Sequence, residues 1–165
     1  MIRPVTFLAV VLLLTQAIFA QCPKVIDPTN PNRHYDLNPL SNAVKDYLAP
    51  NLRYPSYTSF INICRPLIHV DASCPAGTGI CETSSFSSTD IGLANTAFTV
   101  ISEGILHAVF PSPGAGCLSG EIDFTCNPSA GIGQPIYVSE SCVYTYKWET
   151  EHACPKPGNS TETFP

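Results

Sequence analysis

Positive charge is scarce in this sequence. Eight lysines and arginines stand against thirteen aspartates and glutamates, which gives a formal net charge of −5. Arg3 precedes the N-terminal hydrophobic run, and the other seven positive residues are scattered singly along the chain. Nucleic acids and anionic membrane surfaces are bound through clustered positive charge. The composition therefore argues against both kinds of partner.

Motifs of catalysis and metal binding are also missing. The sequence has no C-x-x-C pair, no H-E-x-x-H spacing, no G-x-S-x-G nucleophile elbow and no Walker sequence. His69 and Asp71 are spaced so that the carboxylate could orient the imidazole, but a surface turn before Cys74 is the favoured interpretation. The sequence thus predicts a protein that is not an enzyme and that holds neither a metal nor a cofactor.

Only one long hydrophobic run is present, and it lies at the N-terminus. It extends from Val5 to Phe19, follows one positive charge at Arg3 and ends in the small residue Ala20. This run of about 15 residues is shorter than the roughly 20 that a membrane-spanning helix needs. The layout is typical of a signal peptide over residues 1–20. We expect a mature chain without a membrane span, secreted or in the lumen of the secretory or endolysosomal pathway.

Cysteine, in contrast, is abundant. All eight cysteines lie after residue 20, and an even number in a secreted chain predicts four disulfides rather than a metal site or a reactive thiol. Spacing alone leaves about 105 pairings open for eight cysteines. The cysteines are Cys22, Cys64, Cys74, Cys81, Cys117, Cys126, Cys142 and Cys154.

Helical periodicity is nearly absent from a chain with sixteen prolines and ten glycines. The best helical candidate is residues 38–48, where Leu40, Val44 and Leu48 have helical spacing. The remainder predicts short strands between turns, which favours an all-β flattened barrel or sandwich of two packed sheets. The expected strands are residues 57–64, 78–83, 97–102, 104–110, 121–126 and 142–149.

The last two of these segments show the clearest alternation. In residues 121–126, Ile122 and Phe124 share one face with a cysteine, while acidic and polar residues take the other. In residues 142–149, Tyr144, Tyr146 and Trp148 line one side. These aromatics could form a platform for stacking a sugar, but a place in the core is the favoured interpretation.

The domain plan follows from size and composition. Removal of residues 1–20 leaves 145 of the 165 residues, which is the size of one domain. We expect this domain over residues 21–155 and a flexible tail over residues 156–165, which lacks apolar periodicity. Asn159 in the tail begins the only Asn-x-Ser/Thr sequon and is the predicted N-glycosylation site.

Several sequence blocks resemble the mannose 6-phosphate receptor homology domains. Residues 57–67, YTSFINICRPL, are similar to the family block Y-x-x-x-I-N-V-C-R-P-L. The resemblance runs from about Cys22 to Pro155, keeps all eight cysteines in order and is greatest to the repeats of the cation-independent mannose 6-phosphate receptor. Further blocks lie at residues 35–40 (YDLNPL), 79–81 (GIC), 122–126 (IDFTC) and 142–155 (CVYTYKWETEHACP).

The resemblance implies a disulfide pattern and an architecture. The family pairing corresponds to Cys22–Cys64, Cys74–Cys81, Cys117–Cys142 and Cys126–Cys154. The family fold is a flattened β-barrel of two packed sheets with a ligand pocket at one end.

The resemblance also implies where a ligand pocket would lie. Sugar-binding members carry Gln after the fourth cysteine, Arg shortly after the fifth, Glu before the seventh and Tyr just after it. Here Glu82 replaces the Gln, no Arg follows Cys117, and Glu140 and Tyr144 match the remaining positions. Glu121 falls near the place of the missing Arg, and three carboxylates around one pocket would repel a phosphate.

Two functions are compatible with this pattern. The favoured one is a lectin-like binding module that takes a protein or another non-mannose ligand. The alternative is a lectin for mannose 6-phosphate or high-mannose glycans in lysosomal transport. The absent Arg and Gln favour the first. Either function makes Glu82, Glu140 and Tyr144 the expected ligand-binding residues.

Overall fold

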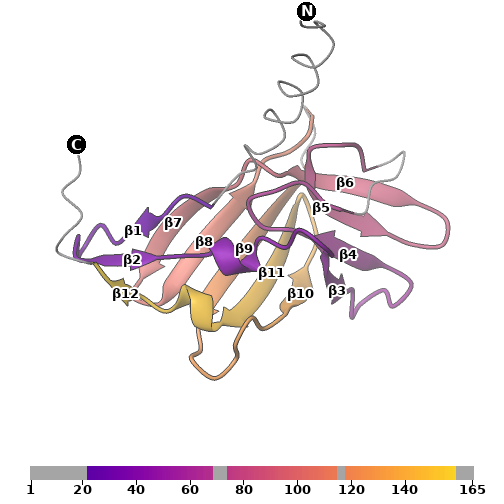
Figure 1. The fold of residues 1–165 in the computed structure, drawn as a ribbon. Coiled ribbons are helices and arrows are strands. Elements are labelled where there is room, and N and C mark those ends of the chain that lie inside the picture. Colours follow the sequence, from indigo (N-terminus) through magenta and orange to yellow (C-terminus); the bar gives the residue numbers. More distant parts are fainter. Residues whose placement is uncertain (1–21, 69–73, 115–117, 159–165) are drawn as a thin grey trace, which may run out of the picture.

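β-Strands make up most of the regular structure (Figure 1). The computed structural model describes residues 22–68, 74–114 and 118–158. Within these ranges the helical elements are two short 3-10 helices, η1 (Asn38–Leu40) and η2 (Glu151–Ala153), and none is long and apolar enough to cross a membrane. The predicted all-β class is therefore confirmed. The strands are β1 (Val25–Ile26), β2 (Arg33–Tyr35), β3 (Tyr47–Pro50), β4 (Thr58–Ile61), β5 (Thr78–Thr83), β6 (Ser88–Leu93), β7 (Ala97–Ser102), β8 (Ile105–Phe110), β9 (Ser119–Cys126), β10 (Pro135–Ser139), β11 (Val143–Thr150) and β12 (Lys156–Pro157).

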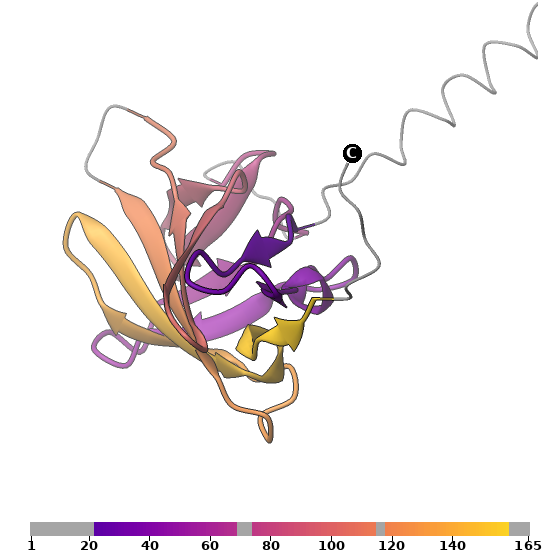
Figure 2. The same ribbon diagram turned by 90° about the vertical axis from the view of Figure 1, so that its left-hand side faces the viewer.

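The strands form three sheets. The largest has the order β10-β11-β9-β8-β7, the second has the order β3-β4-β5-β6, and the small third sheet has the order β1-β2-β12. β9 and β11 pair in parallel, whereas the other ladders are antiparallel. Figure 2 shows the two larger sheets facing each other, as predicted.

One apolar core fills the space between the two larger sheets. Ile61 and Ile80 of the four-stranded sheet and Leu106, Phe124 and Trp148 of the five-stranded sheet are all 0 % exposed. Burial of each such side chain stabilises the fold by roughly 1.5–3 kcal/mol. The core therefore fixes how the two larger sheets pack against each other.

Of the two predicted architectures, flattened barrel or sandwich, the structure has the sandwich, because the sheets do not close. In the described part of the chain, β3 and β10 are edge strands that lie near each other, but no ladder joins them. Pro50 in β3 and Pro135 in β10 have no N–H to donate, which confines proline to the edges and ends of strands. The architecture is an open sandwich with a third, smaller sheet.

The predicted helix over residues 38–48 was wrong. Only η1 is helical, and the segment ends in strand β3, which pairs with β4. The Asn42 side chain accepts hydrogen bonds from the backbone N–H groups of Val44 (2.9 Å) and Lys45 (3.2 Å), which favours a turn over a helix. Leu40 is 0 % exposed and Val44 is 84 % exposed, so the expected apolar stripe does not exist.

The alternation predicted for β9 and β11 is confirmed. Ile122 and Phe124 point into the core, as do Tyr146 and Trp148. The Trp148 ring lies 4.6 Å from the Tyr47 ring, measured between centroids, and its indole N–H donates to the Ile132 carbonyl at 2.9 Å. Tyr146 and Trp148 therefore belong to the core, and neither forms a surface for a sugar.

Three of the four predicted disulfides are present in the described residues. They join Cys22 to Cys64, Cys74 to Cys81, and Cys126 to Cys154, as the family pairing implies. Cys142 is also disulfide-bonded, but Cys117, its predicted partner, lies outside the described residues. The fourth pairing remains a prediction.

The ordered fold continues slightly past Pro155. Strand β12 pairs with β2, with Lys156 opposite His34 and Pro157 opposite Arg33. The predicted signal peptide, residues 1–20, and the sequon at Asn159 lie outside the described residues.

Candidate binding pocket

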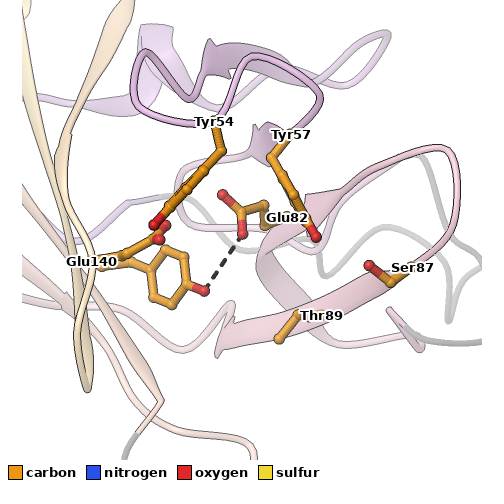
Figure 3. A pocket seen from close by; sticks show the side chains of 7 residues that line it. Tyr54, Tyr57, Glu82, Ser87, Thr89 and Glu140 are labelled. Carbon is orange, nitrogen blue, oxygen red and sulfur yellow. Dashed lines mark hydrogen bonds between the residues drawn. The ribbon is translucent and has the colours of Figure 1, made fainter.

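A pocket opens where the two larger sheets and the β3–β4 loop meet. Its volume is about 400 Å³. In Figure 3 the Glu82 carboxylate lies between the rings of Tyr54 and Tyr57, with Glu140 on another wall. The lining residues are Tyr54, Tyr57, Glu82, Ser87, Thr89, Glu140 and Tyr144.

Glu82 is the most deeply placed acidic group of the pocket. It lies in β5 between β4 and β6, where it pairs with Ser59 on one side and Thr89 on the other. The residue is 5 % exposed. The Tyr144 hydroxyl, from the opposite sheet, donates a hydrogen bond to Glu82 Oε2 at 3.4 Å. The contact joins the two sheets across the pocket.

Asn51 holds the two acidic residues together. Its side-chain N–H group donates to Glu82 Oε1 at 3.1 Å and to Glu140 Oε2 at 3.0 Å. Its Oδ1 accepts from the backbone N–H groups of Arg53 and Tyr54, both at 3.0 Å, which fixes the turn that follows β3. Asn51 is 1 % exposed, so the donor that links the two carboxylates is itself buried.

Sequence reasoning missed Asn51 and Tyr137. The Tyr137 hydroxyl donates to Glu140 Oε2 at 2.9 Å, so Glu140 accepts two hydrogen bonds within the protein. The Pro50-Asn51 pair is a turn signal in the sequence, but no sequence feature relates Asn51 to a glutamate 89 positions later.

Burial sets the electrostatics of the pocket. It raises the pKa of Glu82, and the nearby charge of Glu140 adds to this, against the lowering by hydrogen bonds from Asn51 and Tyr144. Burial and the two carboxylates together raise the pKa of Tyr144 to about 12. Burial and the hydrogen bond to Glu140 raise the pKa of Tyr137. Both tyrosines are therefore neutral hydrogen-bond donors at physiological pH.

The structure brings together all three residues predicted for the site. Glu82, Glu140 and Tyr144 line the same pocket, from β5, the segment after β10, and β11. In the described ranges no group of three or more His, Cys, Asp or Glu residues is arranged to hold a metal ion.

Glu121, in contrast, is not part of the pocket. It alternates with the buried residues Gly120 and Ile122 of β9, and its Oε2 lies 3.8 Å from His107 Nε2. The expectation of three carboxylates around the pocket was therefore wrong.

Gly120 is the inward-facing residue paired with Tyr144, and a Cβ there would lie 2.6 Å from Ile80 Cδ1. A side chain at that position would therefore require the Ile80 side chain to move.

A disulfide-bonded open sandwich with a polar pocket between its two larger sheets is compatible with a binding module. The sequence matches the family described as "Cation-independent mannose-6-phosphate receptor repeat" over residues 15–117. The chain belongs to this family, which is of the mannose 6-phosphate receptor homology type.

Individual relatives agree with this assignment. The chain is 27 % identical over 133 residues to the human cation-independent mannose-6-phosphate receptor; the match covers 74 % of this chain and 5 % of that receptor. The solved structure of chicken IGF2R domain 11 is similar in fold, with a TM-score of 0.62 at 22 % identity, over 79 % of this chain and 90 % of that one.

Proposed function

We propose that the chain is a secreted or lumenal binding module whose pocket takes a protein or another non-mannose ligand. One observation carries the proposal. The buried Glu82 carboxylate, at the position that the resemblance assigns to Gln in sugar-binding members, faces Glu140, and no lysine, arginine or histidine is among the described residues that line the pocket.

The charge of the pocket argues against a phosphorylated sugar. A phosphate monoester carries about −1.5 to −2 charges near neutral pH. It would enter a partly desolvated pocket that already holds two carboxylates, where like charges repel more strongly than in water. No cation lines the described pocket to offset this repulsion.

A neutral mannose also lacks partners. The Arg and Gln of sugar-binding relatives would donate to sugar oxygens, and each unmatched polar group in a buried site costs on the order of 1–3 kcal/mol. Two such losses would move a micromolar site to the millimolar range, since about 1.4 kcal/mol is tenfold in affinity.

One feature favours the alternative, a lectin for mannose 6-phosphate or high-mannose glycans in lysosomal transport. Glu140 and Tyr144, two of the four residues expected in a sugar site, do line the pocket. In that case Glu82 would accept hydrogen bonds from sugar hydroxyls in place of a Gln.

Titration calorimetry on the full mature chain distinguishes the two. We expect no heat of binding from mannose 6-phosphate, methyl α-mannoside or a high-mannose oligosaccharide at millimolar concentration. A micromolar dissociation constant for any of them would reject the non-mannose proposal and establish the lectin.

A further inference from the structure

We propose that the pocket recognises a cationic group, the ammonium of a lysine or the guanidinium of an arginine, held between the Glu82 and Glu140 carboxylates and the surrounding tyrosine rings. This inference rests on the proposed function, because it names the chemistry that the same pocket recognises in its ligand.

The first support is the shortage of positive charge around a buried carboxylate. Glu82 is 5 % exposed, and none of the ion pairs formed among the described residues involves Glu82 or Glu140. Its partners are the neutral donors Asn51 and Tyr144. Carboxylates this deeply buried are normally paired with a cation, because desolvation is costly for an unpaired charge.

Unused hydrogen-bond acceptors give the second support. A carboxylate has about four acceptor sites. Glu82 accepts from Asn51 and Tyr144, and Glu140 accepts from Asn51 and Tyr137, so the described network leaves acceptor sites on both groups. An ammonium brings three donors and a guanidinium five, without acceptors that would meet the carboxylates.

The shape and lining of the pocket give the third support. Tyr54, Tyr57 and Tyr144 all line a cavity of about 400 Å³, and Figure 3 shows the first two rings beside Glu82. Tyrosine faces attract cations. The chain itself illustrates this contact at the rim, where the Arg53 guanidinium carbon lies 5.4 Å from the centre of the Tyr54 ring. A cation inside the pocket would meet both carboxylates and tyrosine rings.

The test uses three probes on the full mature chain. They are a trilysine peptide with blocked ends, the same peptide acetylated on every side chain, and mannose 6-phosphate. Binding is followed by the nuclear magnetic resonance shifts of isotope-labelled tyrosine rings. We expect the trilysine peptide to shift Tyr57 and Tyr144 and to bind more than about tenfold more tightly than its acetylated form, because acetylation removes the charge that meets the buried carboxylates.

Matched variants locate the site. Glu82→Gln with Glu140→Gln removes two charges from the pocket and should weaken trilysine binding more than about tenfold. Glu121→Gln with Asp123→Asn removes two charges beside His107 on the other face of β9 and should leave binding nearly unchanged. The acetylated peptide requires no variant, so the test holds even if the pocket variant folds poorly.

The outcomes separate this inference from the proposed function. Equal binding of the charged and acetylated peptides, or equal loss in both variants, overturns the cation site. Micromolar binding of mannose 6-phosphate overturns the proposed function instead. Spermidine distinguishes the source of the cation: binding as tight as that of trilysine assigns the site to a free amine, and weaker binding assigns it to a protein side chain.

Discussion

Two buried carboxylates at different places in the molecule have opposite surroundings. Asp27, between β1 and β2, is 1 % exposed, and its Oδ2 lies 3.1 Å from an Arg33 nitrogen. Arg33 also pairs with Glu103. Glu82 is 5 % exposed, accepts hydrogen bonds from neutral groups and faces a second carboxylate.

The difference appears in the acidity of the two groups. The Thr29 hydroxyl donates to Asp27 and is the main cause that lowers the Asp27 pKa, with a contribution from Arg33. Burial raises the Glu82 pKa. Asp27 has a cation beside it, although its Oδ2 and Arg33 Nε make no hydrogen bond among the described residues. Glu82 accepts hydrogen bonds only from neutral groups, so a cationic ligand can offset the cost of its burial. Perturbed acidity of this second kind is typical of functional sites.

The largest effect we expect comes from removing the disulfide Cys22–Cys64, which we compare with the shorter loop closed by Cys74–Cys81. Cys22–Cys64 closes a loop with a sequence separation of 42 that contains Asp27, and Cys74–Cys81 closes one with a separation of 7 that ends next to Glu82 in the sequence. From the entropy of loop closure, loss of the first should cost about 4 kcal/mol and loss of the second about 2 kcal/mol. Urea unfolding of Cys22→Ala with Cys64→Ala, and of Cys74→Ala with Cys81→Ala, measures both. A larger loss from the shorter loop would contradict this ranking.

The next effect concerns the amide that separates the two carboxylates. Asn51→Asp preserves size but replaces the shared donor with a third carboxylate, so we expect a loss of about 3 kcal/mol in the free energy of unfolding at neutral pH. Asn127→Asp is the matched control, because Asn127 also donates to a glutamate, Glu149, at 2.8 Å, but at an exposed site. That change should cost at most about 1 kcal/mol. Equal losses of unfolding free energy in the two variants would contradict a larger stabilising role for the buried hydrogen bonds of Asn51.

The sequence predicted much of the two-sheet fold because its signals are local. Alternation located β9 and β11, and the order of cysteines carried the family pairing and the positions of Glu82, Glu140 and Tyr144. The same alternation places Glu121 on the face of the strand opposite Ile122, and the structure confirms this placement. The resemblance instead suggested that Glu121 lies in the pocket, near the position of the missing Arg.

What the sequence could not supply depends on contacts between distant segments. Asn51 acts on residues 31 and 89 positions away, and this arrangement exists only once the two sheets are packed. β3 was mistaken for part of a helix, because the spacing of Leu40, Val44 and Leu48 resembles a helical stripe in a segment that a side-chain-capped turn interrupts.

The pH dependence of stability should have opposite signs at the two sites. A lowered carboxyl pKa, as at Asp27, gives stability that is present above the unfolded-state pKa and is lost as pH falls through the folded-state pKa. A raised pKa, as at Glu82, makes the folded state bind more protons, so stability falls as pH rises from the unfolded-state to the folded-state value.

Urea unfolding between pH 3 and pH 7, roughly the range in which carboxyl groups titrate, measures these signs. Relative to wild type, Asp27→Asn should lose most stability at neutral pH, whereas Glu82→Gln should gain stability as pH rises. If the stability of both variants, relative to wild type, changed with pH in the same direction, the Asp27 and Glu82 carboxyl groups would not have pKa shifts of opposite sign.

The smallest effect concerns Tyr144, the neutral donor to Glu82. Tyr144→Phe removes one hydrogen bond with an oxygen–oxygen distance of 3.4 Å, so its cost should stay below about 1 kcal/mol. Burial and the two carboxylates raise the pKa of this phenol to about 12, so its loss should remove one ionisation near pH 12 from an ultraviolet titration and leave the lower-pH phase unchanged. An unperturbed tyrosine titrates near pH 10. If Tyr144→Phe instead removes absorbance change near that pH, burial and the carboxylates do not raise the pKa of this phenol. The electrostatic contrast with the Asp27 region would then be weaker than the structure indicates.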